Sequence, residues 1–175
     1  MMRKTLTIFE GPDGSGKTTA AKTYAESVCA IYVHFPAYPE ITDNELARVY
    51  LRAMESLVVE QRNVVFDRSW LSERPYGSVF RNGLYRLWEN TQGTLEDIAK
   101  VFDAVVILCD PGLEVCLNNY RARKNLEMLD NEDQLAAVHK AYYEIDTTLP
   151  FAVYNYKTDG DITLFIDEVV SNAQF

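Results

Sequence analysis

A glycine-rich stretch near the start of the chain reads GPDGSGKT over residues 11–18. It fits the pattern G-x-x-x-x-G-K-[ST] at every fixed position. A β-prone run from Leu6 to Phe9 precedes the stretch, and a segment with helical character from Thr18 to Glu26 follows it. The stretch therefore has the strand, loop and helix order that a phosphate-binding loop requires.

The residue types in this phosphate loop (residues 11–18) indicate that it binds a polyphosphate. Glycines let successive backbone N–H groups converge on phosphate oxygens, and the start of the helix adds the positive end of its dipole. The pattern assigns the β- and γ-phosphates to Lys17 and a Mg²⁺ ion to Thr18. The expected ATP-binding residues are Gly11, Asp13, Gly14, Ser15, Gly16, Lys17, Thr18 and Thr19.

Length and charge narrow the class of protein. The chain has 175 residues, which suits a single domain with a sizeable core over residues 1–175. Its net charge of −9 disfavours nucleic acids and anionic membranes as partners and favours small molecules. No apolar run approaches the roughly 20 residues that span a membrane, and the start shows no signal-peptide core. We therefore expect a cytoplasmic protein.

Apolar runs alternate with segments of helical periodicity along the rest of the chain. We expect further strands at 30–35, 64–67, 101–111 and 151–155, with helices between them that include 43–61 and 127–147. This alternation predicts an α/β fold: a P-loop NTPase-type parallel sheet of about five strands with helices on both faces. Ligands of such sheets bind at the carboxyl ends of the strands.

Charged residues follow two of the expected strands. Asp67 ends the run at 64–67, where a carboxylate can order Mg²⁺ and its waters beside the phosphate loop. Arg68 and Arg74 come next, in a polar and aromatic segment that could hold a second anion. A later Arg-Ala-Arg cluster at 121–123 adds two more cations. A chain that can hold two phosphorylated species in this way favours phosphoryl transfer between small molecules.

Four segments together resemble the thymidylate kinase family, particularly its short virus-encoded members. They are FEGPDGSGKTT at 9–19, HFP at 34–36, DRS at 67–69 with Ser72 and Tyr76-Gly77 downstream, and CLNNYRARKNLEMLD at 116–130. The resemblance covers nearly the whole chain. It implies one P-loop nucleotide kinase domain that uses ATP and Mg²⁺ to convert a deoxynucleoside monophosphate such as thymidylate into the diphosphate, with release of ADP.

The resemblance also implies roles for single residues. Lys17, Asp67, Arg68, Arg121 and Arg123 would be catalytic, with Asp67 and Thr18 serving Mg²⁺ and the last two arginines forming a lid over the donor. The acceptor would be bound by Phe35, Tyr38, Arg48, Arg68, Arg74 and Tyr76. Asn44 stands where relatives usually carry a phenylalanine, so stacking on the acceptor base would come from Trp70 or Tyr76.

The same resemblance suggests where the donor and the protein itself would be found. Adenine would rest between the lid arginines and residues 156–160. The protein would lie in the host cytoplasm if it is virus-encoded, and relatives commonly form homodimers through helices. His34 and His139 fit no nucleophile or metal pattern, and we expect both to be structural.

Three alternatives stay open at this point. A deoxynucleoside kinase would need a carboxylate, Glu10 or Asp67, to accept the proton of the acceptor hydroxyl. A non-catalytic nucleotide-binding module or switch would bind ATP without acceptor-dependent turnover. A kinase acting on DNA ends or on modified bases in DNA is disfavoured by the acidic charge.

Overall fold

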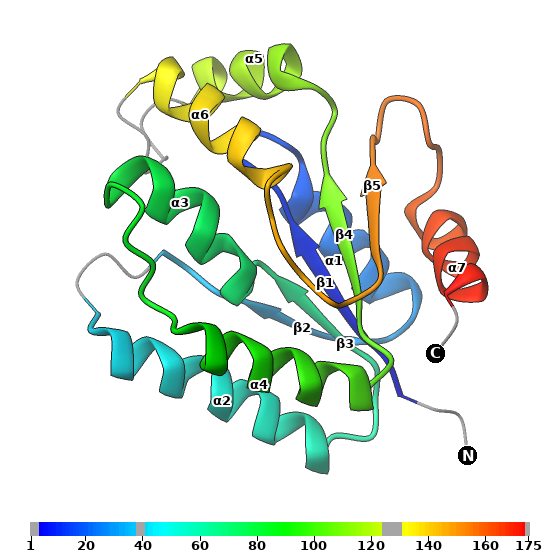
Figure 1. Cartoon of the computed structure of the whole chain (residues 1–175). Helices are drawn as coiled ribbons and strands as arrows, with labels where there is room; N and C mark the ends of the chain where they lie inside the picture. The colour runs from blue at the N-terminus through cyan, green and yellow to red at the C-terminus, as the bar shows by residue number, and fades with distance from the viewer. Residues whose placement is uncertain (1–3, 38–40, 124–130, 174–175) are drawn as a thin grey trace.

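A computed structural model describes residues 4–37, 41–123 and 131–173 as a parallel sheet between two layers of helices (Figure 1). The sheet has five strands in the order β2-β3-β1-β4-β5. In that order they are Ile31–His34, Val64–Asp67, Leu6–Glu10, Val105–Cys109 and Phe151–Tyr154. Every pairing between neighbours is parallel. The expected five-stranded α/β fold is confirmed.

Helices cover both faces of the sheet (Figure 1). One face carries α1 and α7, which pack with the same core cluster. The opposite face carries α2, α3, α4, α5 and α6, and a short 3₁₀ helix, η1, leads into α3. Their bounds are Lys17–Ser27 (α1), Asp43–Val59 (α2), Trp70–Ser72 (η1), Glu73–Phe80 (α3), Glu89–Val101 (α4), Leu113–Arg123 (α5), Glu132–Tyr142 (α6) and Ile162–Asn172 (α7). Within the described ranges, none of these helices has the length and apolar character needed to cross a membrane.

The central strands are apolar because both of their faces are buried. Ile8 of β1 packs in one cluster with Leu46 of α2, while its neighbour Phe9 packs in another with Ala21 of α1. Successive side chains of a strand point to opposite faces, so a strand between two helical layers needs an apolar residue at every position. This requirement explains why the strands could be recognised as short continuous apolar runs.

The largest boundary differences from the sequence prediction concern β4 and α6. The run expected as a strand from Val101 divides: α4 ends there, Asp103 adopts a left-handed φ of 45°, and β4 begins at Val105. The N–H of Phe102 bonds to the carbonyl of Ala99, which closes the helix before the strand starts. The helix expected over 127–147 is shorter, because α6 runs from Glu132 to Tyr142 and residues 124–130 lie outside the described part of the chain.

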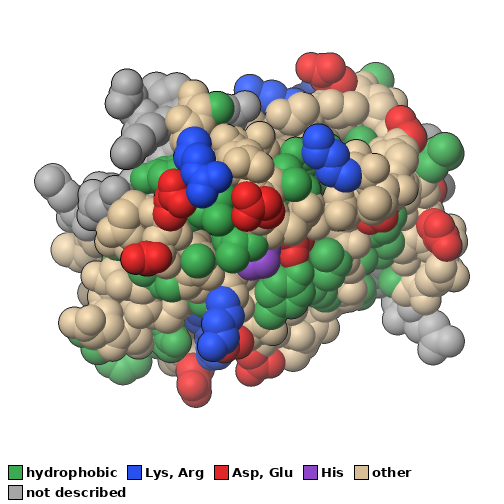
Figure 2. Space-filling view, turned by 90° about the horizontal axis from the view of Figure 1, so that it is seen from above, with side chains coloured by type: hydrophobic (Ala, Val, Ile, Leu, Met, Phe, Trp, Pro, Cys, Tyr) green, Lys and Arg blue, Asp and Glu red, His purple; other side chains and the backbone are tan. Residues whose placement is uncertain are grey.

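The carboxyl ends of the strands meet at the upper edge of the sheet in Figure 1. Because β1 is the central strand, the phosphate loop that follows it lies in the middle of this edge. The segments after β3 and β4 flank it on either side. Figure 2 looks down on this face and shows basic and acidic side chains close together around hydrophobic ones.

Candidate active site

The phosphate loop connects β1 to α1, which begins at Lys17. Gly14 has a φ of 76°, a left-handed conformation that other residues rarely adopt. A Cβ at this position would lie 2.5 Å from the carbonyl oxygen of Cys116 in α5, and one at Gly11 would lie 2.6 Å from the carbonyl oxygen of Cys109 in β4. The loop is therefore fitted closely between β4 and α5, and its shape depends on glycine.

Lys17 is buried inside this loop. Its Nζ lies 3.5 Å from the carbonyl oxygen of Pro12 and 3.8 Å from Oδ1 of Asp13. Burial lowers the pKa of Lys17, and the nearby charge of Arg68 lowers it further. Because a buried ammonium group gains from a close anionic partner, these long contacts favour a bound phosphate at this position.

Asp67 lies at the end of β3 with no exposed surface. Its Oδ2 accepts a hydrogen bond of 2.6 Å from the Tyr32 hydroxyl and lies 3.0 Å from Nδ1 of His34. Within the described residues, its Oδ1 has no hydrogen-bond partner. Burial acts to raise the pKa of Asp67, but Tyr32, the Thr18 hydroxyl and the charge of Lys17 bring it below its ordinary value. Asp67 is therefore an ionised carboxylate with one oxygen left for a cation, a water or a hydroxyl.

Arg68 follows in a left-handed conformation with a φ of 70°. Its Nη2 donates to Oδ1 of Asp13 at 2.5 Å and to the Tyr76 hydroxyl at 2.9 Å, and its Nη1 donates to the Tyr142 hydroxyl at 3.4 Å. The Tyr76 hydroxyl in turn donates to Oδ2 of Asp13 at 2.9 Å. Burial acts to raise the pKa of Asp13, but Arg68 and Lys17 hold it below its ordinary value. The structure thus brings Asp13, Lys17, Arg68 and Tyr76 together.

Glu10 is the last residue of β1 and has no exposed surface. It accepts hydrogen bonds from the Ser69 hydroxyl at 2.7 Å, the Ser72 hydroxyl at 2.6 Å and the Tyr142 hydroxyl at 3.2 Å. Burial is the main cause of its raised pKa. Because both carboxylate oxygens are enclosed and already accept hydrogen bonds, Glu10 is poorly placed to take a proton from a substrate. Of the two candidate bases, Asp67 has the better geometry.

A cavity of about 440 Å³ lies beside the phosphate loop, bounded by α1, α5 and the connection from β5 to α7. Asn119 of α5 donates from Nδ2 to the carbonyl oxygen of Gly14 at 2.8 Å and to the Tyr156 hydroxyl at 3.4 Å, so it ties the loop to the cavity wall. The lining residues are Gly14, Gly16, Thr19, Ala20, Thr23, Asn119, Tyr154, Tyr156, Gly160, Asp161 and Ile162. The cavity includes part of the 156–160 segment that was expected beside adenine.

Of the two arginines expected in the lid, only Arg121 has a side chain that the structure describes. Arg121 donates to both carboxylate oxygens of Glu132, at 2.9 and 2.7 Å, and to Asn118 at 3.0 Å. Its side chain is therefore engaged with α6 and with its own helix, and its role in a lid stays a prediction. Arg123 is the last residue of α5, and its side chain lies outside the described part of the structure, as do residues 124–130.

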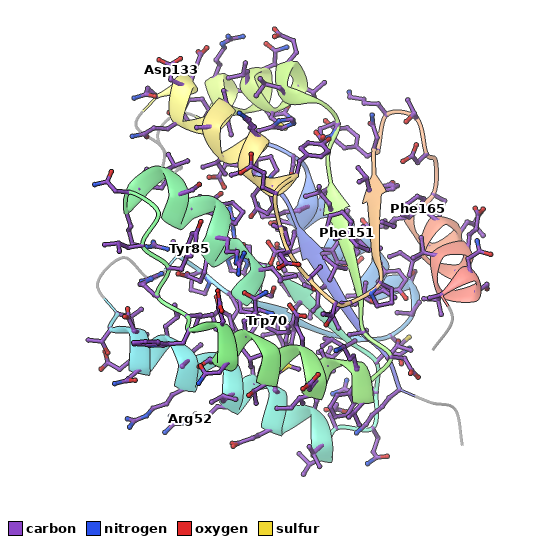
Figure 3. The ribbon with its side chains drawn as sticks, viewed as in Figure 1. Arg52, Trp70, Tyr85, Asp133, Phe151 and Phe165 are labelled. Atoms are coloured by element: carbon purple, nitrogen blue, oxygen red, sulfur yellow. The ribbon has the colours of Figure 1, made fainter. Side chains whose placement is uncertain are left out.

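The aromatic residues expected around the acceptor base lie mostly in the core. The ring of Phe35 is 5.0 Å from Phe66 and 5.1 Å from Tyr50, and only 4% of the residue is exposed. Trp70, labelled in Figure 3, is 1% exposed and lies 6.3 Å from Tyr50. Core packing encloses both rings, so neither presents an open face here, and contact of Phe35 or Trp70 with an acceptor base stays a prediction. Tyr38 falls outside the described residues.

The remaining acceptor candidates lie at different depths. Arg48 is exposed on α2, and its charge acts on Glu45 of the same helix. Arg74 is partly buried, with its guanidinium 5.5 Å from the ring of Tyr85, which Figure 3 labels between α3 and α4. Within the described residues, neither arginine forms a hydrogen bond or an ion pair with the phosphate loop, whereas Arg68 and Tyr76 both bond to Asp13.

Several residues contact the charged groups at this edge of the sheet although the sequence did not predict a role for them in the site. Tyr32 and His34 of β2 hold Asp67, and Tyr142 of α6 reaches both Glu10 and Arg68. His139, also expected to be structural, has its Nε2 2.9 Å from Oδ1 of Asp110 at the end of β4. The HFP segment and the helical pattern located these residues in elements, but neither signal shows which carboxylate a side chain meets.

The chain is similar in sequence to known kinases. The family model described as Polyphosphate kinase 2 (PPK2) matches residues 2–84, which include the phosphate loop and the Asp67–Arg68 segment. A probable thymidylate kinase from Methanococcus aeolicus is 26% identical over 152 residues, which cover 79% of this chain and 77% of that protein. The chain is thymidylate-kinase-like. The resemblance inferred from the sequence is thus confirmed.

Solved structures show the same fold. The YorR protein from Bacillus subtilis, in complex with phosphorylated GDP, has a TM-score of 0.72 at 20% identity and covers 98% of this chain and 100% of its own. A deoxyadenosine kinase from M. mycoides, with the products dCMP and a flexible dCDP bound, has a TM-score of 0.62 at 18% identity and covers 97% of this chain and 100% of its own. The parallel sheet described above is therefore the fold of these nucleotide-binding proteins.

Proposed function

We propose that this protein is a nucleotide kinase that transfers phosphate from ATP to a deoxynucleoside monophosphate, with thymidylate as the leading candidate, and releases the diphosphate and ADP. One observation carries the proposal: the Arg68 guanidinium lies against the phosphate loop, 2.5 Å from Asp13, while Lys17 is 3.8 Å from the same carboxylate. Two cations held by one loop residue are suited to a donor phosphate and an acceptor phosphate that must approach each other. The names of the relatives support the same class of activity.

Phosphoryl transfer to a monophosphate requires little more than two cations that hold the two phosphates close together. A monophosphate oxygen is already ionised at neutral pH, so the transfer depends on positioning and on neutralising negative charge rather than on a base. Lys17 is placed to bind the terminal phosphates of the donor, and Arg68 is placed to bind the acceptor phosphate. Both side chains are largely buried, and charge pairs are stronger where water is excluded.

The residues at the end of β3 fit a magnesium ion. Asp67 has an ionised carboxylate with Oδ1 unpartnered within the described residues, and the Thr18 hydroxyl lies close enough to lower its pKa. In the described ranges, no group of three or more His, Cys, Asp or Glu residues could hold a metal by itself. This is compatible with Mg²⁺, which proteins commonly bind through one or two oxygen ligands together with substrate phosphates. The ion would neutralise charge on those phosphates.

The cavity beside the loop is the proposed place for the donor base. It adjoins Gly14 and Gly16 of the phosphate loop and is walled by the ring of Tyr156. Its volume of about 440 Å³ lies within the range of small-molecule sites. We therefore place ATP with its phosphates in the loop and its adenine in this cavity.

A second candidate is a deoxynucleoside kinase, and one observation favours it. The free Oδ1 of Asp67 is a carboxylate oxygen that could take the proton of an acceptor hydroxyl. A nucleoside acceptor needs such a base, whereas a monophosphate does not.

A substrate panel tests the proposal. The full chain is incubated with ATP and Mg²⁺ and with each of the four common deoxynucleoside monophosphates, or with each of the four deoxynucleosides, and the products are separated by chromatography. We expect diphosphate and ADP with a monophosphate acceptor. Turnover with deoxynucleosides alone would identify the second candidate. ATP binding without acceptor-dependent ADP would identify a non-catalytic module instead.

A further inference from the structure

Glu10 joins three parts of the chain that are far apart in the sequence. It ends β1, directly before the phosphate loop, and it accepts hydrogen bonds from Ser69 and Ser72 after β3 and from Tyr142 at the end of α6. The residue has 0% exposure and, in contrast to Asp67, both of its carboxylate oxygens accept hydrogen bonds, so it is poorly placed to meet a substrate directly. Burial of a carboxylate costs free energy unless the group is hydrogen-bonded. Two of the hydrogen-bond donors to Glu10 connect it to Arg68: Ser69 is the next residue in the chain, and Tyr142 bonds to the guanidinium.

The first route to Arg68 runs along the backbone. The Ser69 hydroxyl donates to Oε1 of Glu10 at 2.7 Å and accepts from the N–H of Leu71 at 3.1 Å, which caps η1. This fixes the turn that follows Arg68, whose left-handed φ of 70° is unfavourable for a non-glycine residue. Such a conformation persists only where the surrounding contacts impose it.

The second route ends on the guanidinium itself. The Tyr142 hydroxyl donates to Oε2 of Glu10 at 3.2 Å and accepts from Nη1 of Arg68 at 3.4 Å. The Ser72 hydroxyl lies 3.1 Å from the same hydroxyl and donates to Oε2 at 2.6 Å. A single hydroxyl therefore separates the carboxylate of Glu10 from the cation of Arg68.

We propose that Glu10 is a positioning residue that holds Arg68 against the phosphate loop, through Ser69 on the backbone side and Tyr142 on the guanidinium side. The acceptor phosphate would then meet a guanidinium whose place is already set. This inference rests on the proposed function, because it takes Arg68 as the group that binds the acceptor phosphate.

The carboxylate is required for a specific reason. The Tyr142 hydroxyl has one proton, which it donates to Glu10 while its oxygen accepts from Arg68, and the neighbouring Ser72 hydroxyl donates its own proton to the same carboxylate. In Glu10→Gln, an amide NH₂ facing Tyr142 would compete with Arg68 for the hydroxyl oxygen. If the NH₂ faced Ser69 instead, the cap of η1 would be disturbed. Either orientation of the amide therefore weakens one of the two connections between residue 10 and Arg68.

Kinetics of Glu10→Gln test this role. We expect the KM for the acceptor monophosphate to rise about tenfold, while the KM for ATP stays within about twofold. Glu96→Gln is the matched control, because Glu96 is also buried and accepts from Thr148 and Gln92, but on α4. The control should change neither KM. A merely structural role for Glu10 would lower the melting temperature and leave the acceptor KM unchanged.

A measurement without substrate separates this inference from the proposed function. The Nε–H signal of Arg68 in a ¹⁵N NMR spectrum is assigned with Arg68→Lys. It should shift or broaden in Glu10→Gln and in Tyr142→Phe, and it should be unchanged in Glu96→Gln. An unchanged signal in Glu10→Gln would overturn the inference even if the wild type is an active kinase.

Two further outcomes, an inactive wild type and a Glu10→Gln variant that does not fold, can also be interpreted. A wild type that phosphorylates no monophosphate would refute the proposed function, while the NMR signal still decides whether Glu10 positions Arg68. If Glu10→Gln does not fold, Tyr142→Phe and Ser69→Ala each remove one route. Both must disturb the Arg68 signal for the inference to stand.

Discussion

The guanidinium of Arg68 donates to the carboxylate of Asp13 across 2.5 Å, which joins the segment after β3 to the phosphate loop. Asp13 also lies 3.8 Å from Lys17, so one carboxylate faces two buried cations. This carboxylate offsets part of the repulsion between the cations and leaves each with further N–H donors. The donor and acceptor halves of the proposed site therefore meet at Asp13.

Arg68→Ala should impair acceptor use far more than ATP binding. Loss of a charge-assisted hydrogen bond to the acceptor phosphate should raise the acceptor KM about 10- to 100-fold. Steady-state kinetics with each substrate varied in turn would measure this. Arg62→Ala is a suitable control, since Arg62 is exposed and pairs with Glu60 away from the loop. Equal acceptor KM values in Arg68→Ala and wild type would refute the assigned role.

Lys17→Ala should reduce kcat itself. Removal of a group that stabilises charge in the transition state costs about 10²- to 10³-fold in rate. Lys22→Ala changes the same residue type one and a half turns later in α1, where the side chain lies over the ring of Tyr32. Normal turnover in Lys22→Ala together with a rate loss in Lys17→Ala is the expected result, measured as ADP release. A similar loss in both variants would indicate general damage to α1.

The donor cavity predicts a different phenotype. Thr23→Trp places a large ring in the cavity beside α1 and should weaken ATP binding by about tenfold or more through steric exclusion. The acceptor KM should change little, because Thr23 is not among the residues around Arg68. Isothermal titration with a non-hydrolysable ATP analogue measures the first effect. Unchanged affinity would show that the base binds elsewhere.

The fold could be predicted because its strands are chemically distinct. β1 and β3 are buried on both faces, so their apolar runs stand out from the helical segments around them. The loop GPDGSGKT was equally clear, because its glycines are required by the backbone conformation and by the closeness of Cys109 and Cys116. In both cases the sequence near the element determines its structure.

The site was less predictable because it is built from distant residues. Tyr142 belongs to a helix whose apolar face predicts a core position, and indeed only 1% of it is exposed, yet its hydroxyl reaches Glu10 from 132 positions away. Phe35 shows the opposite case, since its place after β2 suggested a ligand while Phe66 and Tyr50 enclose it. Residue type and spacing therefore predict that an aromatic residue is buried, but they do not predict which residues its ring or its hydroxyl group contacts.

The phosphate loop should tolerate no Cβ at Gly14. With a φ of 76° and a carbonyl oxygen 2.5 Å from the added atom, Gly14→Ala should lower the free energy of unfolding by roughly 1–3 kcal/mol. Gly93→Ala is the matched control: it lies in the interior of α4 with open space around it, and should raise stability by about 0.5–1 kcal/mol. Urea denaturation compares the two. Stability changes of the same sign would contradict the argument.

The acid sensitivity of the fold should depend on Asp110 at the end of β4. Burial acts to raise the pKa of Asp110, but hydrogen bonds from Tyr143, from His139 and from the N–H of Gly112 hold it below its ordinary value. A carboxylate whose folded pKa is depressed contributes stability in full above its unfolded pKa of about 3.9, and that contribution is lost as the pH falls through the folded value. Asp110→Asn should therefore be less stable than wild type at pH 7, by roughly 1–3 kcal/mol, and the gap should close toward pH 3.

Unfolding free energies between pH 7 and pH 3 check this dependence. Asp97→Asn serves as the control, because Asp97 is 77% exposed and its pair with Lys100 lies on the surface. An exposed pair of this kind contributes little, so its curve should run parallel to that of the wild type. If the Asp110→Asn curve were also parallel to that of the wild type, the pKa of Asp110 would not be lowered in the folded state, and the prediction would be wrong. If the difference in unfolding free energy between wild type and Asp110→Asn disappears at low pH, the ionised carboxylate of Asp110 stabilises the contact between α6 and the carboxyl end of β4.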